Sequence, residues 1–285
     1  MSQNELPAPD SAVKVASAPW NRLTLRTDGA KSGAQVVARI GLSLYSTPLV
    51  TAVLGFLFWA LAARLTTAEV VGRSAAVISA MQFIAAFATL GLHTLLLAEL
   101  ANRDGRTVKR LVVTSLGIAG TVAFIVSVCY AVIQRLFSDR EWLYATPSGI
   151  VLFALGTAVT TVTIVIDGAA IGGQQSGLQV IRNFVFALAK LIALPLAALA
   201  VGMSPGSVYA VWLLGNGVSL VVLFLRTKTP LEWLGTTPSI GGVLPLWRTA
   251  AGHHWVNVAT QAPRLALPVL VAVQVSNEAN AGFYA

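Results

Sequence analysis

The sequence predicts an all-α polytopic membrane protein with about seven transmembrane helices. Of its 285 residues, 56% are apolar and only 11% are charged, and the mean hydropathy is +0.75. A soluble domain carries about 25% charged residues, so this chain has too few charges to build a water-exposed globular surface. Soluble enzymes, nucleic-acid binders and disordered proteins are therefore poor interpretations, and no nucleic-acid partner is expected.

The N-terminal segment, residues 1–36, has no apolar run. It mixes Pro, Ser, Asp, Lys and Arg, and no charged-then-apolar segment leads to the small-residue cleavage site of a signal peptide. We expect a disordered cytoplasmic tail there.

Long apolar segments follow, each near the length of about 20 residues that crosses the hydrocarbon core. A seventh segment is interrupted by Pro263 and Pro268. Between the sixth and seventh, residues 227–251 hold Trp233 and Trp247, which suits a cytoplasmic interfacial connector because indole rings favour the headgroup level. The expected spans are 41–63, 76–98, 111–133, 149–171, 181–202, 207–225 and 252–275.

Basic residues predict the orientation. With the N-terminus inside, thirteen lysines and arginines fall on the cytoplasmic side, and only Arg64, Arg73, Arg135 and Arg140 fall outside. This positive-inside bias also accounts for the net charge of +8. The single cysteine, Cys129, lies in an apolar stretch and permits no internal disulfide. We expect a multi-pass protein of the bacterial cytoplasmic membrane.

Polar residues recur on one face of four expected spans, at the spacing of three, four or seven residues that aligns helix neighbours. Such faces suit the lining of a common aqueous cleft, although the stripe of the seventh span also suits hydrogen bonds between helices. The faces are His254, Asn257, Gln261 and Arg264; Gly156, Thr160, Thr163 and Asp167; Tyr209, Trp212, Asn216 and Ser219; and Asn183 with Lys190.

Two cations, Lys190 and Arg264, fall deep inside expected spans, where an ionisable group is costly and faces the bundle interior or water. Both would favour an anionic ligand such as a phosphate. We therefore expect a substrate-binding set of Lys190, Arg264, Gln261, Asn257 and Asn216. A second pair, Asp167 and Arg182, meets across a short loop and is expected to be structural.

Catalytic signatures are missing from the sequence. It contains no Walker loop, GxSxG elbow, HExxH or paired-cysteine zinc spacing. His253 and His254 have no further His, Cys or carboxylate cluster beside them. We expect no enzymatic activity, no metal and no cofactor.

Several segments resemble the bacterial polysaccharide-biosynthesis membrane proteins, which are oligosaccharide flippases of the multidrug/oligosaccharidyl-lipid/polysaccharide exporter superfamily. The similarity runs from about residue 37 to 285 and rests on diffuse small-residue and aromatic patterns. The segments are Phe58 to Arg64, Val71 to Ala76, Ile166 to Gly168, Gln179 to Asn183, Lys190-Leu191, Asn280-Ala281 and Phe283-Tyr284.

The resemblance implies two six-helix lobes around a central cleft. It also implies movement of a lipid-linked oligosaccharide across the membrane by alternating access. Cationic cavity residues would hold the pyrophosphate, and Lys190 and Arg264 match that role by type and depth. Residues 37–226 would form the first lobe and 252–285 the first helix of an incomplete second one. The chain would then be either a truncated product or a subunit that needs a second chain to complete the cleft.

Two alternatives stay open. A non-transporting accessory membrane subunit fits an incomplete second lobe. A cation-coupled drug exporter of the same superfamily would need acidic residues deep in the first lobe, but Asp167 and Glu99 both lie near helix ends.

Overall fold

The protein is a bundle of α-helices in the computed structural model, which describes residues 50–137, 143–227 and 236–274. The side chains of Asn102, Phe137 and residues 264–274 are outside this description, as are the expected tail 1–36, most of the connector before Thr236, and the C-terminal residues 275–285. The expectation of an all-α fold is confirmed for the described residues. Their helices are Val50–Leu65, α2 (Ala68–Ala88), α3 (Leu92–Glu99), η2 (Leu100–Asn102), α4 (Gly105–Phe137), α5 (Pro147–Gly172), α6 (Ser176–Val201), α7 (Pro205–Arg226), α9 (Ile240–Val243), η3 (Leu244–Leu246) and α10 (Trp247–Gln274).

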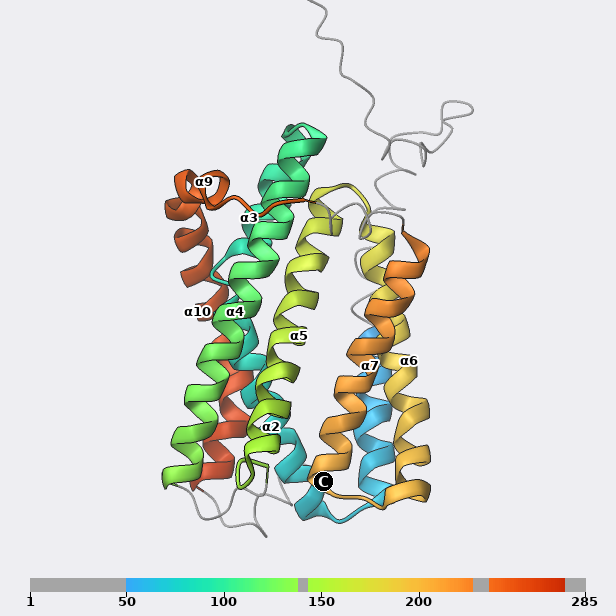
Figure 1. Ribbon diagram of the computed structural model, residues 1–285. Coiled ribbons are helices and arrows are strands. Elements are labelled where there is room, and N and C mark those ends of the chain that lie inside the picture. The colour runs from blue at the N-terminus through green and yellow to red at the C-terminus, as the bar shows by residue number, and fades with distance from the viewer. Residues whose placement is uncertain (1–49, 138–142, 228–235, 275–285) are drawn as a thin grey trace, which may run out of the picture.

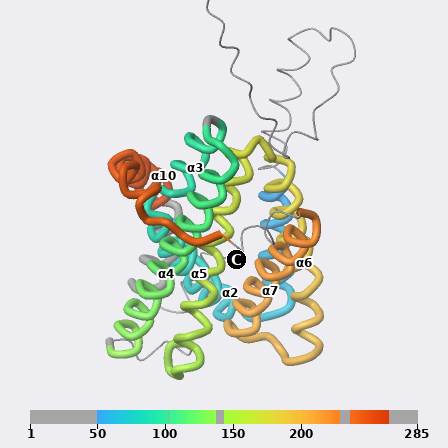
Figure 2. Tube along the Cα trace, turned by 45° about the horizontal axis from the view of Figure 1, so that its top comes forward, coloured from blue at the N-terminus to red at the C-terminus, as the bar shows by residue number. Residues whose placement is uncertain are grey.

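The long helices run alternately up and down the bundle (Figure 1). Helices α2 and α5 are central, because α2 contacts α4, α5, α7 and α10, while α5 contacts α2, α3, α4, α6 and α7. Figures 1 and 2 both show α6 and α7 together on one side of this centre, and α3, α4 and α10 on the other. The bundle therefore has two flanks joined through α2 and α5.

Five of the described helices are long and apolar enough to cross a membrane: α2, α4, α5, α6 and α7. This supports a multi-pass membrane protein, and the expected count of seven spans is not confirmed within the described residues. The described part of the first expected span, Val50–Leu65, is apolar but shorter. Helix α10 runs continuously through Pro263 and Pro268 but carries His253, His254, Asn257 and Gln261, which lower its apolar character.

The second expected span, 76–98, differs most from the structure. Helix α2 begins at Ala68, where the Thr67 hydroxyl accepts a hydrogen bond from the Val70 N–H. The chain then breaks at Leu90 and Gly91, both with positive φ, before α3 begins. A Cβ on Gly91 would collide with the Ala250 carbonyl of α10. The break therefore lies where α10 approaches the backbone, and glycine permits both the close approach and the left-handed conformation.

Apolar side chains form two separate core clusters. One gathers aromatic rings of Phe58, Tyr144, Phe153 and Tyr209, and the other gathers leucines of α3 with the start of α4 and Val243 of α9. Helix α5 contributes Phe153 to the first cluster and Val165 to the second. Its intervening stretch is polar but buried, with Thr157, Thr160, Thr161 and Thr163. A polar middle thus separates the two cores.

One end of the bundle is basic, namely the end where α4, α6 and α10 begin (top in Figure 1). The described residues place six cations there: Arg103, Arg106, Lys109, Arg110, Arg226 and Arg248. The opposite end carries Arg64, Arg73 and Arg135 among the described residues, with Arg73 paired to Glu69. The positive bias seen in the sequence is therefore a bias between the two ends of the described bundle.

Replacing Gly168 by alanine is expected to destabilise the bundle by about 1–3 kcal/mol, because overpacked sites must shift backbone. A Cβ at Gly168 of α5 would collide with the His93 carbonyl of α3. Gly217 of α7 is a matched control, since a Cβ there meets nothing within 4 Å, and an open helical Gly→Ala change usually stabilises. Unfolding by SDS in mixed micelles measures both, and equal effects of the two variants would contradict the close α3–α5 contact.

Candidate functional site

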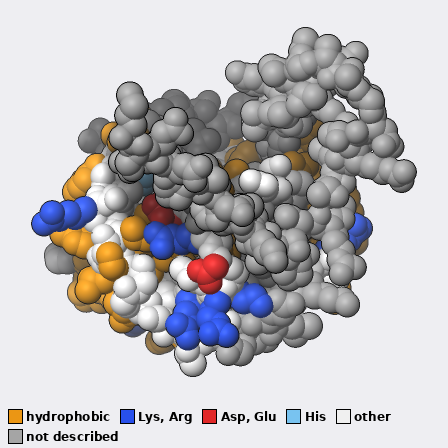
Figure 3. Space-filling model, turned by 90° about the horizontal axis from the view of Figure 1, so that it is seen from above, with side chains coloured by type: hydrophobic (Ala, Val, Ile, Leu, Met, Phe, Trp, Pro, Cys, Tyr) orange, Lys and Arg blue, Asp and Glu red, His pale blue; other side chains and the backbone are white. Residues whose placement is uncertain are grey.

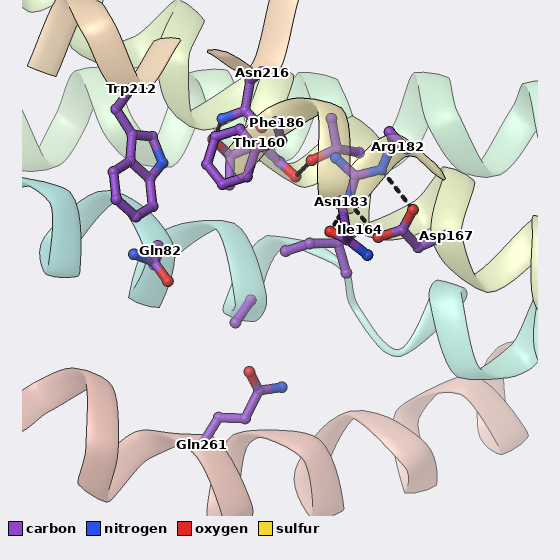
Figure 4. Close-up of a pocket in the computed structure, with 12 residues that line it drawn as sticks. Gln82, Thr160, Ile164, Asp167, Arg182, Asn183, Phe186, Trp212, Asn216 and Gln261 are labelled. Atoms are coloured by element: carbon purple, nitrogen blue, oxygen red, sulfur yellow. Dashed lines mark hydrogen bonds and ion pairs between the residues drawn. The ribbon is translucent and has the colours of Figure 1, made fainter. Parts of the chain in front are cut away.

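The candidate site is a partly open cavity of about 220 Å³ lined by residues of α2, α5, α6, α7 and α10. Figure 4 shows polar side chains of α5, α6 and α7 along one wall and Gln261 of α10 facing them from the other. The cavity lies beside the polar middle of α5. Its lining residues are Gln82, Ala86, Thr160, Thr163, Ile164, Asp167, Arg182, Asn183, Phe186, Trp212, Asn216 and Gln261.

An ion pair between Asp167 of α5 and Arg182 of α6 closes one end of the cavity (Figure 4). The Arg182 guanidinium donates from Nε to Asp167 Oδ1 at 2.7 Å and from Nη2 to Oδ2 at 2.5 Å. Nη2 also donates to Asn183 Oδ1 at 2.8 Å. The Arg182 side chain is only 6% exposed and the Asp167 side chain only 15%. This bidentate geometry gives specificity as well as energy, and it leaves the pair with no net charge.

Amide side chains supply most of the remaining polar surface. Asn216 donates from Nδ2 to the Thr160 hydroxyl at 3.3 Å, and that hydroxyl in turn donates to the Gly156 carbonyl. Gln82 and Gln261 have no hydrogen-bond partner within the described ranges. An amide offers two donors and an acceptor with two lone pairs, so the cavity presents groups that can bind a polar, uncharged ligand.

Phe186 and Trp212 form an aromatic wall, with Lys190 behind it. The Lys190 ammonium lies 3.9 Å from the ring centroid of Trp212, 4.6 Å from Phe186 and 4.8 Å from Phe58. These are cation–π distances, and the lysine is only 4% exposed. No carboxylate of the described residues pairs with it. The rings thus hold an unneutralised charge next to the cavity but outside its lining.

The structure brings only some of the expected substrate-binding residues to the cavity. Asn216 and Gln261 line the cavity, whereas Lys190 and Asn257 do not. Arg264 lies on α10, but its side chain is outside the described part of the molecule. Asp167 and Arg182, expected as a structural pair, form the ion pair that bounds the cavity.

The polar faces expected from helical spacing meet at the cavity only in part. Thr160, Thr163 and Asp167 line it from α5, and Trp212 and Asn216 line it from α7. Asn183 lines it from α6 and Gln261 from α10. Four further members make contacts between or within helices: Tyr209 donates to the Phe153 carbonyl, a Cβ on Gly156 would collide with Tyr209, Ser219 donates to the Asn216 carbonyl, and His254 packs on Phe87.

Sequence reasoning missed Gln82 and Phe186 as lining residues. Gln82 is the one amide in the apolar run of α2, and a polar residue in such a run is a signal for the bundle interior. Phe186 carries no such signal, because an apolar ring in a span suits core, lipid or cavity equally. The described residues contain no group of three or more His, Cys, Asp or Glu side chains that suits a metal ion.

Replacing Asn257 by alanine is expected to lower stability by about 0.6–2 kcal/mol, the range for hydrogen bonds between helices in membranes. Asn257 Nδ2 of α10 donates to the Thr94 hydroxyl of α3 at 2.8 Å. Gln261→Ala is the matched control, because that amide has no protein partner within the described residues and should leave stability unchanged. Unfolding in mixed micelles measures both, and an equal loss in the two variants would contradict a structural role particular to Asn257.

Comparison with known proteins assigns no family: no protein-family model, no curated protein and no solved structure matches the chain.

Proposed function

We propose that this chain is a flippase that moves a lipid-linked oligosaccharide across the bacterial cytoplasmic membrane by alternating access, with its N-terminus in the cytoplasm. The observation that carries the proposal is the polar cavity inside a bundle of apolar helices. Polar surface in the middle of such a bundle is costly and usually marks the path of a substrate. The resemblance to oligosaccharide flippases supplies the substrate class.

The cavity chemistry supports a sugar-bearing ligand. Binding sites of this kind combine apolar and aromatic walls with a few placed polar groups. Here the amides of Gln82, Asn216 and Gln261 face the same space as the rings of Phe186 and Trp212. The amides can exchange hydrogen bonds with sugar hydroxyls, and the rings can pack against the apolar faces of the sugar.

The charges and the outer surface support a lipid-linked anion. Lys190 contributes one positive charge that no described carboxylate neutralises, and it would attract the pyrophosphate together with Arg264. The lipid tail would stay in the bilayer along the outer faces of the helices. On α6 these are strongly apolar, with Leu188, Ile192 and Leu199 exposed.

The size of the cavity bears on how a substrate of this class would enter. At about 30 Å³ per water, 220 Å³ holds roughly seven waters, which is too little for an oligosaccharide. On this proposal the two flanks must part further to admit the substrate.

A deletion strain tests the proposal, because it should accumulate lipid-linked glycan in the inner leaflet and the wild-type gene should reverse this. The double variant Asn216→Leu/Gln261→Leu should fail to reverse it. Gln134→Leu is the matched control, since this amide bonds to Tyr130 near the far end of α4, away from the cavity. Normal glycan in the deletion strain would contradict the proposal. Altered drug susceptibility would then favour an exporter, and a co-purified partner an accessory subunit.

A further inference from the structure

A short apolar elbow, residues 239–248, projects from the basic end of the bundle. It comprises α9, η3 and the first residues of α10. Ile240, Leu244 and Trp247 are 65%, 62% and 56% exposed, while Val243 between them is buried at 7%. One side of the elbow is therefore fixed to the bundle, and its other side is an apolar surface.

The elbow is attached to α4 below the helix start. Ser239 donates from its backbone N–H to the Thr114 hydroxyl at 2.9 Å, and Val243 packs in one cluster with Leu111 and Val112. Thr114 lies nine residues after Gly105, where α4 begins, so α4 extends about 14 Å beyond this contact at 1.5 Å per residue. The first turns of α4 thus stand farther out than the apolar elbow.

Those first turns of α4 carry unpaired positive charge. Arg106 and Arg110 are exposed, stand one turn apart on one face, and have no ion-pair partner in the described ranges. Arg103, by contrast, is paired with Glu99. Hydrogen bonds from Thr107 lower the pKa of the Asp104 carboxyl, so this acid stays ionised but is engaged at the helix start. Figure 3, which looks onto this end, shows Lys and Arg side chains gathered beside hydrophobic ones.

The apolar elbow and the basic first turns of α4 lie at different heights, in the same order as the acyl chains and the headgroups of a lipid leaflet. Apolar side chains with a tryptophan belong at the boundary of the acyl chains, and arginines one or two turns farther out belong at the headgroups. Arg248 also lies over the Trp247 ring at 5.8 Å, which joins a cation to the apolar surface. An acidic soluble partner would match the charges but not the exposed apolar side chains beside them.

We propose that the elbow and the start of α4 form a binding surface for anionic phospholipids. Arg106 and Arg110 bind the headgroup phosphate, while Ile240, Leu244 and Trp247 pack among the acyl chains. This surface is separate from the cavity, and it would select anionic over zwitterionic lipid in the leaflet at the basic end.

Quenching of tryptophan fluorescence by brominated lipids tests this. The full chain is placed in phosphatidylcholine vesicles with either brominated phosphatidylglycerol or brominated phosphatidylcholine, and a Trp247→Phe variant isolates the signal of Trp247. We expect the anionic lipid to bind about tenfold more strongly near Trp247, and 0.5 M NaCl to reduce this preference. Equal quenching by the two lipids would overturn the proposal.

The arginine pair has a matched control at the opposite end. Arg106→Gln/Arg110→Gln should abolish the preference for phosphatidylglycerol, whereas Arg64→Gln/Arg135→Gln removes the same charge from exposed sites and should retain it. Circular dichroism shows that each variant is folded. A preference that survives in the first variant, or that is lost equally in both, would overturn the assignment of the headgroup site to α4. Binding of an acidic peptide with no lipid preference would assign the surface to a protein partner instead.

Discussion

Replacing Arg182 by alanine is expected to destabilise the protein by about 3–5 kcal/mol, the range measured when one partner of a buried ion pair is removed. The variant would leave the Asp167 carboxylate, only 15% exposed, without the two guanidinium hydrogen bonds it now accepts. Asp167 and Arg182 join α5 to α6, so the loss should also loosen the contact between these helices. Unfolding by SDS in mixed micelles measures the change.

Two further variants separate the ion pair from a general loss of charge. Arg226→Ala removes an exposed arginine at the end of α7 and should change stability by no more than about 0.5 kcal/mol. Asp167→Leu/Arg182→Met removes both charges and should recover most of the stability, because a buried pair replaced by apolar groups is often neutral or better. If Arg182→Ala costs less than about 1 kcal/mol, the pair does not hold α5 to α6.

The pair also has a functional consequence that the double variant exposes. Neutralising both groups would remove the polar end of the cavity while preserving the fold. If the cavity binds the substrate, the stable double variant should complement the deletion strain poorly. The double variant would then be stable but poorly active, a combination that a purely structural role of the ion pair does not predict.

Helix positions follow from local sequence where the ends have local signals. Residues 149–171 were expected as a span, and α5 runs Pro147–Gly172 because the Thr146 hydroxyl accepts from the Gly149 N–H and proline follows it. Likewise, Ser204 and Ser207 form a capping box at the start of α7. The break at Gly91 has a different cause. It depends on the backbone of α10, about 160 residues later in the chain, which local periodicity does not reveal.

At the cavity, too, the local sequence predicts part of the arrangement, and contacts with distant parts of the chain determine the rest. Helical spacing placed Asn183 and Lys190 on one face of α6, but only Asn183 lines the cavity. The two residues are two turns apart, and at the depth of Lys190 the rings of Phe58 and Trp212 intervene from other helices. Periodicity specifies which side of a helix a residue occupies. What fills that side at a given depth depends on the packing of the whole bundle.

Replacing Lys190 by methionine is expected to reduce transport at least about tenfold, the loss that corresponds to one charge-assisted hydrogen bond to the substrate anion. This prediction rests on the proposed flippase function. Methionine fills a similar space and packs favourably against aromatic rings, so the free energy of unfolding should stay the same or rise. Complementation of the deletion strain and unfolding in mixed micelles measure the two effects separately.

Lys190→Arg tests whether the charge or the ammonium itself matters, because arginine keeps the cation and its contacts with the rings. It should retain more transport than Lys190→Met. Arg135→Met controls for loss of one positive charge, since Arg135 is exposed near the end of α4 and its removal should leave transport intact. Full transport by a stable Lys190→Met variant would show that the lysine serves neither binding nor folding.

The free energy of burying the Lys190 ammonium explains why its charge should matter for transport. Taking an ammonium out of water costs several kcal/mol, and each of the three rings at 3.9–4.8 Å returns about 2 kcal/mol when the contact is desolvated. Cost and return are of similar size, so a neutral side chain would suit the described arrangement about as well as lysine does. Two of the rings that contact the ammonium, Trp212 and Phe186, also line the cavity. On the proposed function, an anion bound there would interact favourably with the charge, so the charge should matter for transport and not for the resting fold.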